Sequence, residues 1–142
     1  MYSTVKMLHS YWAYLVFLML VVATFNALFK TFTNKEYEAR DFRISLFTLI
    51  VSHIQFLIGI ILWFVDDYFG EMSMGEIMKN SVLRSNVVEH PVVMILAVVC
   101  ITIGYSKHKK QLSSAGKLKK IAIFYSIALL LVCAKIPWDR LF

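Results

Sequence analysis

Hydrophobic residues in this chain are concentrated in four long stretches that alternate with short polar segments. The stretches run approximately Leu8–Phe29, Ile44–Val65, Val92–Tyr105 and Ile121–Ile136. A helix that crosses a bilayer needs about 20 mainly apolar residues. The first two stretches reach this length by themselves, and the last two reach it with flanking residues. The pattern therefore predicts four spanning helices, at about 6–29, 44–66, 87–106 and 120–137.

The overall composition supports a membrane protein. Of the 142 residues, 59% are hydrophobic, and the mean hydropathy is +0.67. Soluble domains are usually about 45–50% apolar, so the excess is expected to face lipid. We predict an all-α integral membrane four-helix bundle, with residues 1–142 forming a single domain. The first stretch is expected to be an uncleaved helix, because its apolar run is too long for a signal peptide and no small-x-small cleavage site follows it.

The basic residues predict the orientation of this bundle. Segments 30–43 and 106–120 together carry ten Lys or Arg residues, whereas segment 66–86 carries two, with four acidic residues. Because cytoplasmic loops are enriched in Lys and Arg, the two basic segments are expected in the cytoplasm. Both termini and segment 66–86 then lie outside. We expect no nucleic-acid binding, since the lysines occupy short loops without a nucleic-acid motif.

Two local signals refine this plan. Ser73 followed by Glu76 has the spacing of a capping box, which predicts a short helix between the second and third spans. Pro91 is expected in the first turn of the third span, where its missing N–H leaves no bond broken. The two cysteines form no CxxC or CxxCH motif, which excludes covalent haem attachment and a zinc ribbon.

The histidines are the main candidates for chemistry. At about 1.5 Å of rise per residue, His9 and His90 lie at a similar outer level, and His53 lies nearer the centre of the bilayer. Ionisable residues inside membranes usually face the bundle interior. His108 falls in the basic segment 106–120 and is expected to be solvated.

Helical spacing indicates where these side chains point. His9 heads a seam with Ala23 and Ala27, and His90 heads a seam that contains Ala97 and Gly104. Small residues mark contacts between membrane helices, so both histidines are expected to point inward. His53 lies off the polar seam of its own helix, which favours a cofactor or an apolar groove as its neighbour. The alternative for His53 is a hydrogen bond to an adjacent helix.

Two imidazoles at one depth inside a four-helix bundle can ligate haem iron from opposite faces. We therefore predict haem b held by His9 and His90. Arg84 and Lys135 fall near the same outer level and would pair with the haem propionates. Three alternatives stay open: hydrogen bonding of the histidines within the bundle, a non-haem metal held with the help of Glu89, and a Lys135 that only reaches toward the membrane surface.

Short motifs add a family resemblance. The opening Lys6-Met7-Leu8-His9 and the ending Lys135-Ile136-Pro137 resemble the K-x-L-H and K-P segments of HemJ-type membrane protoporphyrinogen oxidases and their CopD-like relatives. More broadly, the chain resembles small bacterial four-helix membrane proteins described as "cytochrome B", a likeness carried by Leu8–Trp12, Ser52–Gln55, Glu89–Pro91 and Pro137-Trp138. The resemblance implies haem b and a bacterial cytoplasmic membrane. It carries over His9 as a ligand by position, whereas His53 and His90 rest on the pattern arguments and the broader likeness.

Three functions follow from these observations. The first is a b-type haem protein that transfers electrons, linked to a quinone. The second is a HemJ-like oxidase acting on a porphyrin precursor, which would make the protein an oxidoreductase. The third is an accessory subunit without a cofactor, associated with another membrane protein or with further copies of itself.

Overall fold

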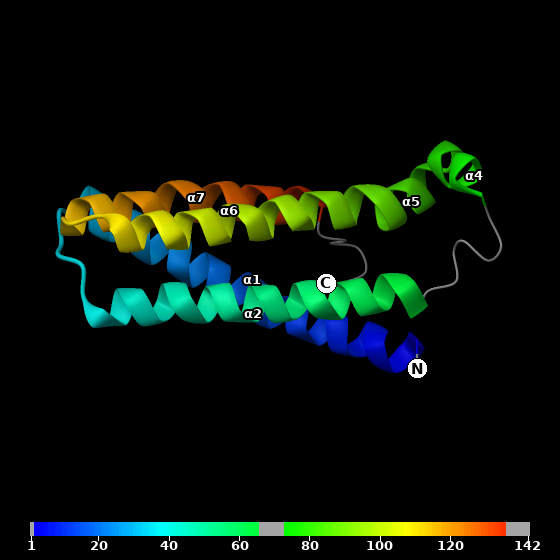
Figure 1. Ribbon diagram of the computed structural model, residues 1–142, viewed down its shortest axis with the longest axis horizontal. Helices are drawn as coiled ribbons and strands as arrows, with labels where there is room; N and C mark the ends of the chain where they lie inside the picture. Colours follow the sequence, from blue (N-terminus) through cyan, green and yellow to red (C-terminus); the bar gives the residue numbers. More distant parts are fainter. Residues whose placement is uncertain (1, 66–72, 136–142) are drawn as a thin grey trace.

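In the part of the chain that the structure describes, regular structure is entirely helical. The computed structural model describes residues 2–65 and 73–135. Four long helices form the body of the protein (Figure 1): α1 (Tyr2–Phe32), α2 (Ala39–Val65), α6 (His90–Lys110) and α7 (Ser114–Lys135). Two short helices, α4 (Met74–Lys79) and α5 (Ser81–Arg84), and a π-helical turn, η1 (Ser85–Glu89), lead into α6.

The four long helices pair as two hairpins. α1 packs on α2, and α6 packs on α7, while α1 also contacts α7 and α2 contacts α6. α1 and α6 are therefore diagonal to each other across the bundle. The connections 33–38 and 111–113 lie together at one end, which we call the turn end, and α4 lies at the opposite end, which we call the α4 end (Figure 1).

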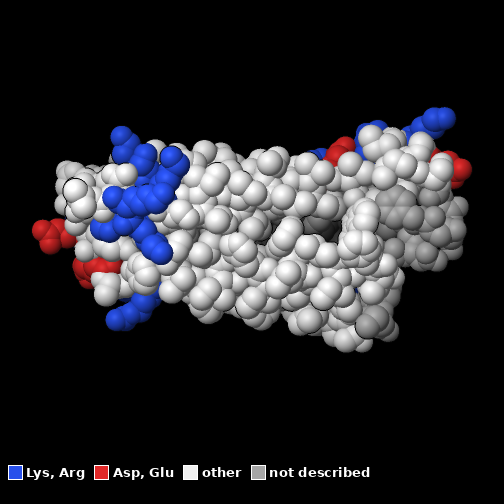
Figure 2. All heavy atoms as spheres, viewed as in Figure 1, with Lys and Arg blue, Asp and Glu red and all other residues white. Residues whose placement is uncertain are grey.

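The outer surface of the bundle suits a hydrocarbon environment. Lys and Arg side chains gather at the turn end, a smaller group of charged side chains lies at the α4 end, and the face between them is free of charged side chains (Figure 2). Three helical stretches are long and apolar enough to cross a membrane: Ser3–Phe32, Ala39–Val65 and Val87–Lys110. These three stretches make the chain a multi-pass membrane protein.

α7 is not among these three stretches. It begins with several lysines and ends at Lys135, so its uncharged run 121–134 spans only about 21 Å of helix. The predicted fourth span, 120–137, also continues past the described residues, as does the predicted end of the second span at 66. The residues Pro137 and Trp138 lie outside the described part as well.

The interior is built on the small-residue seams. Ala23, Ala27, Ala97 and Gly104 are all buried, which confirms that the faces headed by His9 and His90 point inward. At Gly104, a Cβ atom would lie 2.5 Å from Cβ of Phe124 in α7. Such close approach explains why small residues occupy these positions.

The segment leading into α6 follows its sequence signals. Ser73 caps α4, accepting a hydrogen bond from the backbone N–H of Glu76 at 3.3 Å, so the predicted short helix is confirmed. Pro91 lies in the first turn of α6. Because proline cannot donate to the carbonyl of residue 87, that carbonyl accepts from the indole N–H of Trp63 at 2.9 Å instead. This bond ties the start of α6 to α2.

Candidate functional site

His9 and His90 meet in the interior near the α4 end. They come from the diagonal helices α1 and α6, and their ring centroids lie 6.3 Å apart with the ring planes at 74°. The expected common depth of the two rings is thus confirmed. Both side chains are half-buried. The pair is therefore surrounded mainly by protein and is still partly accessible from outside the bundle.

The surroundings of the two rings differ. Nδ1 of His90 lies 2.9 Å from the backbone carbonyl of Lys135, at the end of α7. A carbonyl only accepts, so this nitrogen carries a proton and the tautomer is fixed. Nδ1 of His9 is buried and has no hydrogen-bond partner among the described residues. The ring of His9 lies against α2 at Gly59, where a Cβ would be 3.5 Å from Cε1.

Gln55 connects the same region of α2 to α1. Its amide N–H donates to the backbone carbonyl of His9 at 3.0 Å. Its carbonyl oxygen Oε1 is buried without a partner among the described residues. Native proteins rarely leave buried polar atoms unsatisfied. The His9 neighbourhood therefore holds two such atoms, one on each helix of the α1–α2 hairpin.

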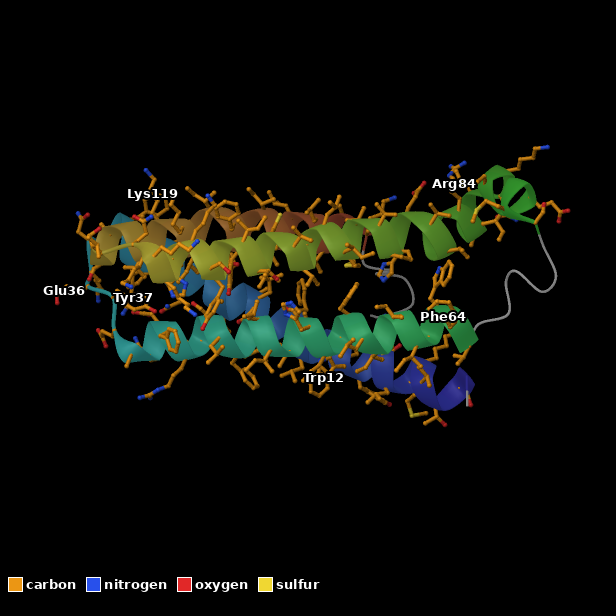
Figure 3. The ribbon with its side chains drawn as sticks, viewed as in Figure 1. Trp12, Glu36, Tyr37, Phe64, Arg84 and Lys119 are labelled. Atoms are coloured by element: carbon orange, nitrogen blue, oxygen red, sulfur yellow. The ribbon has the colours of Figure 1, made fainter. Side chains whose placement is uncertain are left out.

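Arg84 and Lys135 share a carboxylate beside this pair. Glu89, which precedes His90, accepts from Lys135 Nζ at 2.6 Å and from Arg84 Nε at 3.0 Å. All three side chains are about one-third exposed, and Figure 3 shows Arg84 at the α4 end. Two cations against one carboxylate leave an excess of one positive charge next to His90.

His53 lies apart from the two other histidines of the predicted site. Nδ1 is 2.8 Å from the carbonyl of Leu49 in its own helix, and Nε2 is 3.3 Å from Oγ1 of Thr102 in α6. With Phe56, His53 lines an apolar groove between α2 and α6. His53 thus borders an apolar groove and also contacts the neighbouring helix α6 through Thr102, so the structure shows features of both interpretations.

The turn end contains a polar cluster that the sequence pattern did not identify. Lys30 and Asp41, counted above as loop residues, belong to α1 and α2 and are only 3% and 1% exposed. Their charged atoms lie 2.6 Å apart. Asp41 also accepts from the amide of Asn26 at 2.7 Å and from the backbone N–H of Glu38 at 2.8 Å. Segment 30–43 contains three acidic and four basic residues, and the sequence does not indicate which of them pair.

The expectation that His108 is solvated is wrong. His108 is fully buried at the end of α6, because segment 106–110 continues the helix instead of forming a loop. Its Nδ1 donates to the carbonyl of Tyr105 at 2.6 Å, and its Nε2 accepts from the hydroxyl of Tyr37 at 2.9 Å. Tyr37 lies at the turn end (Figure 3). Burial, together with the negative charge of Asp41, raises the pKa of Tyr37 to about 12.

The two ends therefore offer different chemistry. At the turn end the buried groups Lys30, Asp41 and His108 all have partners, so this cluster holds the helices together. At the α4 end the His9–His90 pair lies beside buried atoms that lack partners. In the described ranges, no three His, Cys, Asp or Glu side chains are grouped so as to hold a metal ion. The carboxylate of Glu89 is instead engaged by its two cations.

The chain matches no family model, no curated protein and no solved structure.

Proposed function

We propose that the protein is a membrane-embedded b-type haem protein that transfers electrons, with a quinone as its redox partner. The observation that carries the proposal is the facing pair His9 and His90. Both imidazoles would ligate the haem iron, and the 6.3 Å separation of their ring centroids would keep both rings within reach of one metal.

The polar surroundings of the pair also fit haem ligation. Ligating histidines usually donate their second ring N–H to a carbonyl or carboxylate, which fixes the tautomer. The contact of His90 Nδ1 with the Lys135 carbonyl has this form. Nδ1 of His9 is buried without a partner among the described residues, so it is the nitrogen that would be available to bind the iron. Haem would supply a one-electron couple, and its potential would depend on the two imidazoles and nearby charges.

The charged groups fit the anionic edge of such a cofactor. Propionates carry negative charge, and the Arg84–Glu89–Lys135 cluster retains one excess positive charge. In this proposal Arg84 and Lys135 attract the propionates, and Glu89 orients both cations. Arg84 and Lys135 would therefore bind Glu89 and attract the propionates at the same time.

The membrane arrangement completes the proposal. α7 packs along α6 and α1, so we propose that it crosses the bilayer with them, as a fourth and shorter span. Both termini and the α4 end then face the outside of a bacterial cytoplasmic membrane. The basic turn end faces the cytoplasm, in keeping with the positive-inside rule.

Visible spectroscopy of the detergent-purified protein tests the proposal. We expect a low-spin bis-histidine haem spectrum that changes on reduction with dithionite. His9→Ala and His90→Ala are each expected to abolish it, whereas His53→Ala, at a histidine outside the pair, is the matched control and is expected to retain it. Loss of the spectrum in His53→Ala together with retention in His90→Ala would contradict the assigned pair.

The same preparation separates the other two functions. A protein without any haem spectrum, obtained from cells supplied with haem precursors, would favour an accessory subunit. Turnover of protoporphyrinogen by the haem-loaded protein would favour the HemJ-like oxidase.

A further inference from the structure

The groove between α2 and α6 has a polar feature that the proposed haem site does not use. On the face seen in Figure 2 the surface is hollowed between the two hairpins. The groove has a volume of about 260 Å³, and its lining includes Phe56, Ile95, Val98 and Val99. His53 and Thr102 are the polar residues of this lining.

A count of protons shows that Nε2 of His53 lacks a good donor. Nδ1 lies 2.8 Å from the Leu49 carbonyl, so it carries the proton of a neutral imidazole and Nε2 is an acceptor. The hydroxyl of Thr102 has one proton for two acceptors. It lies 2.8 Å from the carbonyl of Val98 but 3.3 Å from Nε2. The shorter bond is the better one, so Nε2 receives at most a weak hydrogen bond.

The position of this acceptor restricts what can satisfy it. His53 is exposed at the surface of α2 in the middle of an apolar stretch. The rim residues Ile95 and Val99 are also exposed, at 43% and 44%. In a bilayer, this surface faces hydrocarbon, which supplies no water to complete the weak hydrogen bond at Nε2. A molecule that enters from the lipid phase and brings a hydrogen-bond donor would give Nε2 a stronger partner.

We propose that this groove binds the ring of a lipid-soluble quinol, one hydroxyl of which donates a hydrogen bond to Nε2 of His53. The choice of a quinol rests on the proposed electron-transfer function; the donor requirement does not. The groove is smaller than the pockets of roughly 300–1,000 Å³ that enclose drug-sized ligands. It suits a single ring whose isoprenoid tail stays in the lipid.

The hydrogen-bond requirement also gives the site a preference between redox forms. A quinol has hydroxyl donors, whereas a quinone has only carbonyl acceptors. A neutral His53 with its proton on Nδ1 can bond the first but not the second. The groove is therefore a quinol site, and the oxidised ring binds it more weakly.

Equilibrium binding to the full chain in lipid nanodiscs tests this site, with binding to empty nanodiscs subtracted. The probes are a decyl-substituted benzoquinol, its dimethyl ether and the matching benzoquinone. Wild type is expected to bind the quinol about five- to tenfold more tightly than the ether or the quinone, as one hydrogen bond allows. His53→Phe keeps a ring but no acceptor, and is expected to reduce this ratio to about one.

Two further variants control for position. Val99→Trp fills the groove and is expected to weaken binding of all three probes. Leu130→Trp adds the same bulk on α7, at a residue that is 71% exposed and does not line the groove, and is expected to change none. Equal binding of quinol and ether by wild type, or an unchanged ratio in His53→Phe, would overturn the hydrogen bond. Unchanged binding in Val99→Trp would overturn the groove.

The outcome is separable from the haem proposal. A preparation that shows the haem spectrum but does not discriminate between the probes contradicts the quinol site alone. A preparation without haem that still discriminates through His53 contradicts the haem proposal and leaves the quinol site standing.

Discussion

The two ends of this bundle place similar polar groups inside the protein but satisfy them differently. At the turn end, Lys30 and Asp41 form a buried pair, and both ring nitrogens of His108 have partners. At the α4 end, Nδ1 of His9 and Oε1 of Gln55 are buried without partners in the described part of the chain. The buried side chains of Lys30, Asp41 and His108 are thus paired. His9 and Gln55 each leave a buried atom without a partner among the described residues, as do the hydroxyls of Thr24 and Ser126 on α1 and α7.

This difference separates stability from function. A buried polar atom without a partner is unfavourable by about 1–3 kcal/mol, whereas a satisfied one is roughly neutral or slightly favourable. Buried polar atoms without a partner often have a role in catalysis or in binding a ligand, water or ion. The turn end is therefore expected to govern folding, and the α4 end to govern binding.

The compartment that each end faces is the sharpest test of the contrast, because its outcome is all or none. Reporter fusions at residues 36 and 114 are expected to report the cytoplasm, and a fusion at residue 75 is expected to report the outside. The motive is the concentration of Lys and Arg at the turn end (Figure 2). The reverse pattern would put the His9–His90 pair on the cytoplasmic side.

Breaking the buried pair should have the largest effect on stability. Asp41→Ala leaves Lys30 buried without its main partner, which typically destabilises a protein by about 3–5 kcal/mol. Glu38→Ala is the matched control. Its carboxylate lies 3.5 Å from the same lysine but is 64% exposed, so a change of about 0–1 kcal/mol is expected. Unfolding of both variants in mixed detergent measures the difference, and similar values for the two would contradict a stabilising role of the Lys30–Asp41 pair.

The same substitution at two histidines should give opposite results in the haem-free protein. His108→Leu removes two hydrogen bonds and leaves the Tyr37 hydroxyl without its acceptor, so we expect a loss of about 1–3 kcal/mol. His9→Leu removes a buried nitrogen that has no partner, so we expect unchanged or slightly increased stability. Denaturation of both haem-free variants is the measurement. Equal losses would mean that His9 is as structural as His108.

The smallest effects are expected in the redox potential. Lys135→Gln or Arg84→Gln removes a cation near the haem and should lower haem retention and the midpoint potential, because positive charge favours the reduced iron. Glu89→Gln removes the anion and should raise the potential. Solvent screens these partly exposed charges, so the shifts in potential are expected to be small. Redox titration measures these shifts, and unchanged values in all three variants would reduce the cluster to a surface anchor.

The sequence by itself determined the membrane character, the helices and the inward faces. Three of the four predicted spans correspond to helices that are long and apolar enough to cross a bilayer. The seams headed by His9 and His90 are buried where expected. These features depend on helical periodicity and on the length of apolar runs, which are local properties of the chain. The short helix after Ser73 was equally readable, since a cap involves neighbouring residues.

Only the tertiary structure decided which polar groups satisfy one another. Lys30 pairs with Asp41, and Glu89 joins Lys135 across 46 residues of sequence. His108 is buried where the helical end of α6 packs against Tyr37 and Phe42 from other segments. Such partners depend on how separate helices pack, and the linear pattern carries no record of that packing. For the same reason, only the packed structure shows that Nδ1 of His9 and Oε1 of Gln55 are buried without partners among the described residues.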